Sequence, residues 1–233
     1  MFMLAVLQSA RLSLSSMLTY GWVLVTFSML LAYQVSGTAL ASPLISYAHR
    51  LISQPWADSL GAVFVGLRYL LFLLLVTTVF LMLFATTRAS VERKDIHYYA
   101  KYTMGSLYLF YFLLVMPFVF VCPFIGYFLL DSNQGLSNAF KAVARGFVVV
   151  LYCLPVTALF AAFSGVLLLA SFTFRTFMAS IAPVATNFTS ELAHFFIAYF
   201  IPGVVFLVVL QLILSLHSVF YVRLKHTQRQ FFF

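Results

Sequence analysis

The sequence predicts an all-α integral membrane protein, a polytopic bundle of transmembrane helices. Of its 233 residues, 64% are apolar and 8% are charged, whereas soluble domains average about 45–50% apolar and about 25% charged. The mean hydropathy is +1.07. Several apolar runs are long enough, at about 1.5 Å per helical residue, to cross a hydrocarbon core of about 30 Å. The connectors between these runs are short, so residues 1–233 are expected to form a single membrane domain.

The basic residues predict which partners the chain meets. Thirteen Lys and Arg against five Asp and Glu give a net charge of +8, which in a soluble protein would suggest nucleic acid. Here they lie mainly in connectors and in the tail at 223–233, where they act as topology signals and contact anionic lipid headgroups. We expect a lipid partner and no nucleic acid. Cys122 and Cys153 both fall in apolar stretches, so no disulfide framework is expected.

The first third of the chain is expected to hold two spans. Residues 1–16 have no basic residue before their apolar run, unlike a cleaved signal peptide, and predict an amphipathic helix in the membrane interface with Arg11 toward the headgroups. Residues 17–35 are the first span. Residues 36–60 are a connector with a short interfacial helix, and 61–86, the most hydrophobic run, is the second span.

The chain after residue 87 contains several prolines within or beside its apolar runs. Residues 88–102 form a basic loop, and 104–130 have no charge but two prolines, Pro117 and Pro123, each of which removes a helix hydrogen bond. Further segments follow: a turn and an amphipathic helix at 131–146 that Ser137 or Asn138 could cap, a span at 147–170 containing Pro155, an interfacial loop at 171–190, and a last span at 192–222.

The distribution of basic residues decides between two topologies. If 104–130 crosses once, the chain has five spans, and twelve connector and tail bases divide six against six. If it enters and leaves on one side, the chain has four full spans, and only Arg50 and Arg175 face the other ten. The positive-inside rule favours the second arrangement, with 104–130 as a proline-broken re-entrant pair of half-helices shielded by protein. A kinked single span, or six spans with an extra crossing at 171–190, are the alternatives.

The order of these features resembles the YciC-like family of uncharacterised bacterial inner-membrane proteins. The likeness rests on a proline-broken stretch ending FLLDSNQG, a following segment SNAFKAVARG at 137–146, and a last span ending Phe220-Tyr-Val-Arg-Leu-Lys. It implies a bacterial inner-membrane location, and the positive-inside rule places the basic loops and the C-terminus in the cytoplasm. The chain departs from the family in its shorter proline-broken stretch. The family has no established activity to carry over.

Two groups of polar residues are candidates for function. A charged side chain deep in a span costs about 2.5–3.5 kcal/mol on insertion scales, so Arg68 needs a partner. Glu191 and Asp58 are the candidates, and His194 lies one helical turn from Glu191. The four form a possible intramembrane polar cluster, for which a structural tie or an interfacial cap is the plainer interpretation. The second group is a lipid-headgroup rim of six bases: Arg88, Arg93, Lys94, Lys101, Lys141 and Arg145.

No catalytic or metal-binding motif is found in the sequence. We therefore expect no enzyme, cofactor or metal, and favour a noncatalytic scaffold, assembly factor or accessory subunit, with other membrane subunits as partners. The alternative is a small-solute or ion transporter or channel, because broken helices place backbone dipoles around substrates. A scaffold should pack dry and expose an apolar flank to a partner, whereas a transporter should hold a polar cavity at the membrane midplane.

Overall fold

The computed structural model describes residues 1–19, 54–94, 106–132, 135–184 and 188–227, and all the regular structure within them is helical. Three stretches are long and apolar enough to cross a membrane: Asp58–Glu92 in α4 (Gln54–Glu92), the whole of α9 (Leu154–Ile181), and Ala193–Thr227. The last stretch joins α10 (Phe188–Phe195), a π-helical turn (Phe196–Phe200) and α11 (Ile201–Thr227). The predicted all-α fold is confirmed for the described residues, and three of its helical stretches have the length and apolar composition of transmembrane helices. Most of the predicted first span at 17–35 lies outside the described residues.

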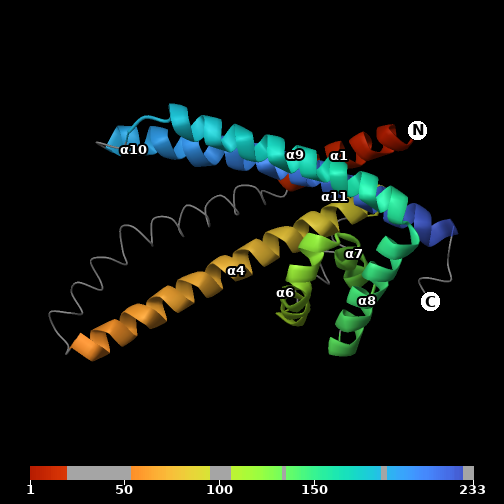
Figure 1. The fold of residues 1–233 in the computed structure, drawn as a ribbon, viewed down its shortest axis with the longest axis horizontal. Coiled ribbons are helices and arrows are strands. Elements are labelled where there is room, and N and C mark those ends of the chain that lie inside the picture. The colour runs from red at the N-terminus through yellow and green to blue at the C-terminus, as the bar shows by residue number, and fades with distance from the viewer. Residues whose placement is uncertain (20–53, 95–105, 133–134, 185–187, 228–233) are drawn as a thin grey trace.

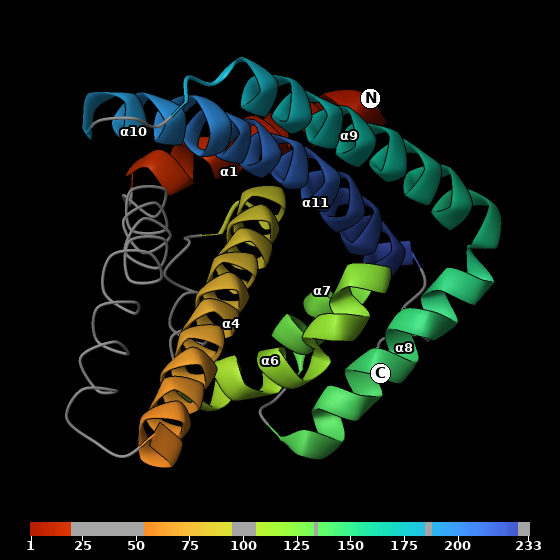
Figure 2. The same ribbon diagram turned by 60° about the vertical axis from the view of Figure 1, so that its left-hand side comes forward.

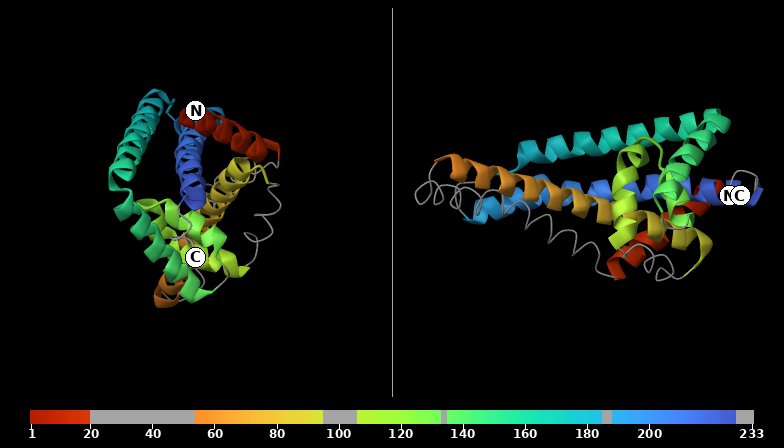
Figure 3. Two further views of the ribbon diagram at one scale, coloured as in Figure 1. Left: turned by 90° about the vertical axis from the view of Figure 1, so that its right-hand side faces the viewer. Right: turned by 90° about the horizontal axis from the view of Figure 1, so that it is seen from below.

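The three long helices lie roughly along the long dimension of the molecule, and one of them runs opposite to the other two (Figure 1). α4 and α11 run the same way along the long axis of the molecule, and α9 runs the opposite way (Figure 1). α11 lies between α9 and α4 when the molecule is viewed along that axis (Figure 3). Because α9 begins at the end where α4 finishes, the intervening helices α6, α7 and α8 do not carry the chain to the opposite end (Figures 1 and 2).

The core lies where the C-terminal halves of α4 and α11 meet α6 (Ser106–Val121), α7 (Phe124–Asp131) and α8 (Leu136–Tyr152). Aromatic rings dominate it. Phe84 of α4 contacts Tyr127 edge to face with ring centroids 4.8 Å apart, and Phe128 meets Tyr221 of α11 in the same way at 5.0 Å. Such pairs contribute about 0.5–1.5 kcal/mol beyond the area they bury. They therefore fix how α7 sits between α4 and α11.

The proline-broken stretch forms two helices, and only one proline breaks it. Pro117 lies inside α6, whereas α6 ends at Val121 and α7 begins after Pro123. Every residue from Phe124 to Leu130 is buried. At about 1.5 Å per residue, the 16-residue α6 and the 8-residue α7 are each too short to cross a core of about 30 Å. A break in this stretch was predicted, and its position is decided by Pro123.

The following segment corrects three expectations. α8 begins after Gly135, which has a positive φ of 151°, and neither Ser137 nor Asn138 caps it, because both lie within its first turn. The predicted continuous span at 147–170 is interrupted at Cys153, because Pro155 is accepted at the start of a new helix where no backbone N–H is needed. The predicted loop at 171–190 is wrong for its first half, because α9 continues to Ile181.

Helix α8 is amphipathic, as predicted, but its buried face consists of small residues. Ala139, Ala142, Gly146 and Val149 follow one another at spacings of three and four and are buried against α7. A methyl group added at Gly146 would overlap the side chain of Ile125. The close approach of α7 and α8 therefore depends on the missing side chain at this position.

Helix α4 is longer than the span predicted for it. It starts at Gln54, within the expected connector, and ends at Glu92, within the expected basic loop. Arg93 has a left-handed φ of 54°, and the Lys94 N–H donates to the Ala89 carbonyl over 3.0 Å. This is the Schellman termination of a helix, at a position usually taken by glycine.

The N-terminal helix α1 (Phe2–Thr19) lies against α4 and α11. Arg11 is exposed, as predicted, but the packed face consists of Val6, Ser9 and Ser13. The large residues Met3, Leu4, Leu7, Leu12 and Leu18 point outward. An interfacial helix would turn leucines of this kind into the membrane, so the interfacial position of α1 stays a prediction, while its contact with the rest of the protein is made through Val6 and two serines.

Candidate functional site

A cluster of four charged side chains lies at the C-terminal ends of α4 and α11. Its centre is Arg88, whose side chain is completely buried. The Arg88 Nη2 atom lies 2.7 Å from Glu92 Oε1, one turn along α4, and 3.1 Å from Asp131 Oδ2 at the end of α7. The guanidinium also lies 4.9 Å from the ring centroid of Tyr221. A buried arginine needs this combination because desolvation of an isolated charge costs several kcal/mol.

Asp131 connects three helices through one carboxylate. Its Oδ2 atom accepts hydrogen bonds from the Tyr221 hydroxyl and the Lys225 ammonium of α11, both at 2.7 Å, as well as from Arg88. The two cations, Arg88 and Lys225, balance the two carboxylates, Asp131 and Glu92. These four charges therefore tie α4, α7 and α11 together and cancel one another, while Lys94 adds a fifth, half-exposed charge 3.2 Å from Glu92.

A second set of hydrogen bonds extends the tie into the core. Tyr127 of α7 donates to the Leu214 carbonyl of α11 over 2.7 Å, and its oxygen lies 3.0 Å from Thr87 Oγ1 of α4. Each hydroxyl has one proton and a carbonyl acceptor of its own, Leu214 for Tyr127 and Leu83 or Phe84 for Thr87, so either can be the donor in their mutual contact. Tyr108 of α6 donates to the Leu129 carbonyl over 2.6 Å near the end of α7. The short helix α7 is thereby held from three sides.

A polar seam separates α1 from α11. Gln211, which is 1% exposed, donates from Nε2 to the Ser13 hydroxyl. The oxygen of the Gln211 amide, like the hydroxyls of Ser9 and Ser215, is buried without a hydrogen-bond partner in the described part of the chain. Buried polar atoms of this kind are uncommon and call for an explanation.

The predicted intramembrane cluster is described only in part. The side chains of Arg68 and Glu191 lie outside what the structure describes, although α4 and α11 do start at the same end of the molecule (Figure 1). Asp58 is exposed near the start of α4. His194 lies with its Nδ1 atom 2.9 Å from the Pro183 carbonyl, which links α10 to the end of α9. The pairing of Arg68 with Glu191 stays a prediction.

The predicted headgroup rim needs one correction. Arg88 is not available to lipid headgroups, because α4 continues past it and turns its side chain inward to Asp131. Arg93, Lys141 and Arg145 are exposed, as a rim requires. Lys94 is 48% exposed and pairs with Glu92 at 3.2 Å. Lys101 lies outside the described residues.

The sequence did contain signals for the cluster that were not used. Arg88 and Glu92, like Tyr221 and Lys225, are four residues apart and therefore share a helix face. Asp131 is the acid that ends an uncharged, buried helix, a place where a carboxylate needs a basic partner. The identity of that partner depends on the packing of α4 beside α11, which residue spacing does not give.

The cluster can fix helices in place but has few features of a reactive centre, because each carboxylate is already engaged by basic side chains. Among the residues that the structure describes, no three His, Cys, Asp or Glu side chains are placed to hold a metal ion. No family model, curated protein or solved structure matches this chain.

Proposed function

We propose that this chain is a noncatalytic multi-pass membrane protein that acts as a scaffold, an assembly factor or an accessory subunit of a membrane complex. The observation that supports this best is the exposure of α9. Only 11% of its most apolar window is buried, against 53% in α4 and 33% in the stretch that contains α11. A helix attached by one narrow face is free to contact another subunit on its others.

The outer face of α9 has the composition of a helix–helix contact. Ala158, Ala161, Ala162 and Gly165 are all exposed and lie on one side, whereas Thr157 and Ser171 are buried on the other. A Cβ added at Gly165 would meet no atom within 4 Å. Small residues spaced by four let helix backbones approach closely in membranes, so this face suits a partner helix.

The proposal is tested by purifying the protein in a mild detergent and measuring whether stoichiometric partners come with it. Gly165→Leu should release the partner, because the added side chain keeps the backbones apart. Val166→Leu is the matched control, since Val166 is exposed beside that face. Purification without any partner in every mild detergent, or equal effects of the two substitutions, would contradict the proposal.

The proposed topology has four full spans, the first at 17–35, with 104–130 as a re-entrant pair of half-helices. The shared direction of α4 and α11 (Figure 1) supports it, because five spans would make them antiparallel. The segments at 88–102 and 131–146 and the C-terminus then face the cytoplasm, as the positive-inside rule favours. The YciC-like resemblance implies that the membrane is a bacterial inner membrane. Reporter fusions after Asn138 and Arg229 should both give the cytoplasmic signal, and an external signal after Asn138 would refute the re-entrant model.

The same topology underlies the proposed pairing of Arg68 with Glu191 across the outer leaflet. The exchange of charges, Arg68→Glu together with Glu191→Arg, should recover stability that either single substitution loses. Additive losses in the double variant would count against the pairing.

A transporter is the second candidate, and the polar seam between α1 and α11 favours it. Buried oxygens of Ser9, Gln211 and Ser215 without partners would be satisfied by water or a solute. In a Cys122→Ala, Cys153→Ala background, Ser215→Cys should react with a membrane-impermeant thiol reagent if the seam is a water-filled path. A scaffold with a dry seam should leave this cysteine unlabelled.

A further inference from the structure

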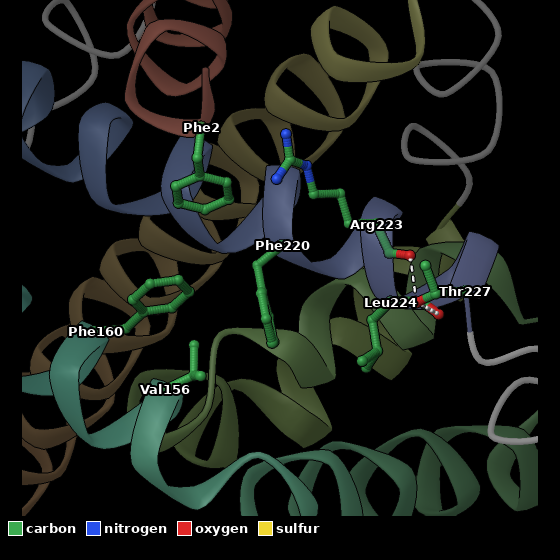
Figure 4. A pocket seen from close by; sticks show the side chains of 7 residues that line it. All are labelled: Phe2, Val156, Phe160, Phe220, Arg223, Leu224 and Thr227. Atoms are coloured by element: carbon green, nitrogen blue, oxygen red, sulfur yellow. Dashed lines mark hydrogen bonds between the residues drawn. The ribbon is translucent and has the colours of Figure 1, made fainter.

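An open cavity of about 360 Å³ lies between the start of α1, the start of α9 and the end of α11 (Figure 4). Five apolar side chains line it: Phe2, Val156, Phe160, Phe220 and Leu224. Arg223 and Thr227 supply its polar wall. The cavity joins three elements that are far apart in the sequence, at the end of the molecule where α1 begins and α11 finishes (Figure 1).

The apolar wall is a preformed aromatic surface. Phe2 stacks with Phe160 with ring centroids 6.1 Å apart, and Phe160 meets Phe220 edge to face at 5.3 Å. The rings come from α1, α9 and α11 respectively. A surface of this kind accepts methylene groups without rearrangement, because its side chains already support one another.

The polar wall carries one exposed cation. The Arg223 guanidinium lies 5.1 Å from the ring centroid of Phe2 and points toward it (Figure 4). Within the described part of the chain no carboxylate forms an ion pair with Arg223, whereas Lys225 is engaged by Asp131 at 2.7 Å. Thr227 donates its hydroxyl proton to the Arg223 carbonyl over 3.0 Å. The cavity therefore has a hydrophobic floor and a positive rim.

We propose that this cavity binds one anionic phospholipid, with the phosphate on Arg223 and the first part of an acyl chain on the aromatic wall. Arginine presents a planar fork of donors that matches phosphate oxygens. Basic pockets between transmembrane helices recognise anionic headgroups in this way. The volume lies at the lower end of the range of about 300–1,000 Å³ for small-molecule sites, so the distal chain extends into the bilayer. This site differs from the headgroup rim, in which exposed bases attract any anionic surface.

The test measures lipid binding to the purified full-length protein in neutral detergent by native mass spectrometry. The probes are phosphatidylglycerol and phosphatidylcholine with identical chains. Phosphatidylglycerol should bind more tightly, and Arg223→Gln should weaken it about fivefold, as expected for loss of one basic residue at headgroup level. Arg223→Lys should retain part of the preference. Arg175→Gln is the control, because Arg175 is an exposed base on α9 that belongs neither to the cavity lining nor to the headgroup rim.

A second variant tests the contact with the acyl chain of the lipid rather than the contact with its charged headgroup. Val156→Trp should fill the cavity and weaken phosphatidylglycerol binding without lowering the melting temperature, since Val156 is partly exposed at the start of α9. Millimolar inorganic phosphate should not displace the lipid. The proposal is overturned if the two lipids bind equally, if Arg175→Gln and Arg223→Gln have equal effects, if Val156→Trp binds normally, or if phosphate competes fully.

Discussion

Replacement of Asp131 by asparagine should destabilise the protein more than any other single charge removal in the described residues. The substitution keeps the size of the side chain but removes the carboxylate that accepts hydrogen bonds from Arg88, Tyr221 and Lys225. Arg88 then keeps Glu92 as its carboxylate partner. The ion pair between α4 and α7 is lost, together with the charge that balances Lys225.

The magnitude follows from the burial of the two partners. Breaking a fully buried ion pair costs about 3–5 kcal/mol, because the remaining charge is uncompensated. Arg88 is fully buried, but the Asp131 side chain is 20% exposed and Glu92 remains. We therefore expect a loss of about 2–3 kcal/mol in the free energy of unfolding. Lys94→Ala should cost about 0–1 kcal/mol, because Lys94 is 48% exposed in its pair with Glu92.

The assay is unfolding of the purified protein in mixed micelles with an increasing fraction of denaturing detergent, followed by circular dichroism. A double-mutant cycle with Arg88→Met and Asp131→Asn should give a coupling energy of at least about 1 kcal/mol. Two results would refute the reasoning. One is a cost for Asp131→Asn no larger than that of Lys94→Ala, and the other is strict additivity in the cycle.

Four further substitutions test other parts of the fold in the same assay. Gly146→Ala should cost about 1–3 kcal/mol by forcing α8 from α7, whereas Gly165→Ala should gain up to about 1 kcal/mol because its surroundings are open. Equal effects at the two glycines would contradict the close helix approach. Arg93→Gly should raise stability by about 1 kcal/mol, because Arg93 has a left-handed backbone; a loss would argue against the Schellman end. Tyr127→Phe should cost about 1 kcal/mol through its lost hydrogen bonds, and a neutral result would show that they contribute nothing.

Composition was sufficient to predict the class of the fold. A chain this apolar can satisfy its backbone in a bilayer only through helices or a closed barrel, and the long apolar runs selected helices. The apolar run at 61–86 lies in α4, as a helix predicted there requires, and the amphipathic pattern within 131–146 lies mostly in α8. Boundaries were less accurate. α4 extends beyond its apolar run at both ends, since polar residues continue a helix that a hydropathy window ends.

The prolines show why local rules were not enough. Pro117, Pro123 and Pro155 have the same intrinsic cost, yet the first lies inside α6 while the other two mark helix starts. Each freed carbonyl must be satisfied by its surroundings, and those surroundings come from packing against other helices. The sequence predicted a break within 104–130 without deciding at which proline, and it predicted no break at Pro155, where a new helix starts.

The candidate site was the hardest part to anticipate. Arg88 was assigned to a headgroup rim because it opens a basic segment, whereas α4 continues for another turn and buries it. Its partner Asp131 is 43 residues away and lies on another helix. Nothing in the spacing of residues along the sequence indicates that these two side chains are in contact.

The sequence by itself determined that this protein is helical and apolar enough for a membrane, because hydrophobic transfer and backbone hydrogen bonding act on every residue regardless of its distant neighbours. Only the tertiary structure decided that α7 is enclosed between α4 and α11 (Figure 2). It also decided that Arg88 and Lys225 meet at Asp131. These features depend on interactions that fall off within a few ångströms. They exist only after helices far apart in the chain have packed together.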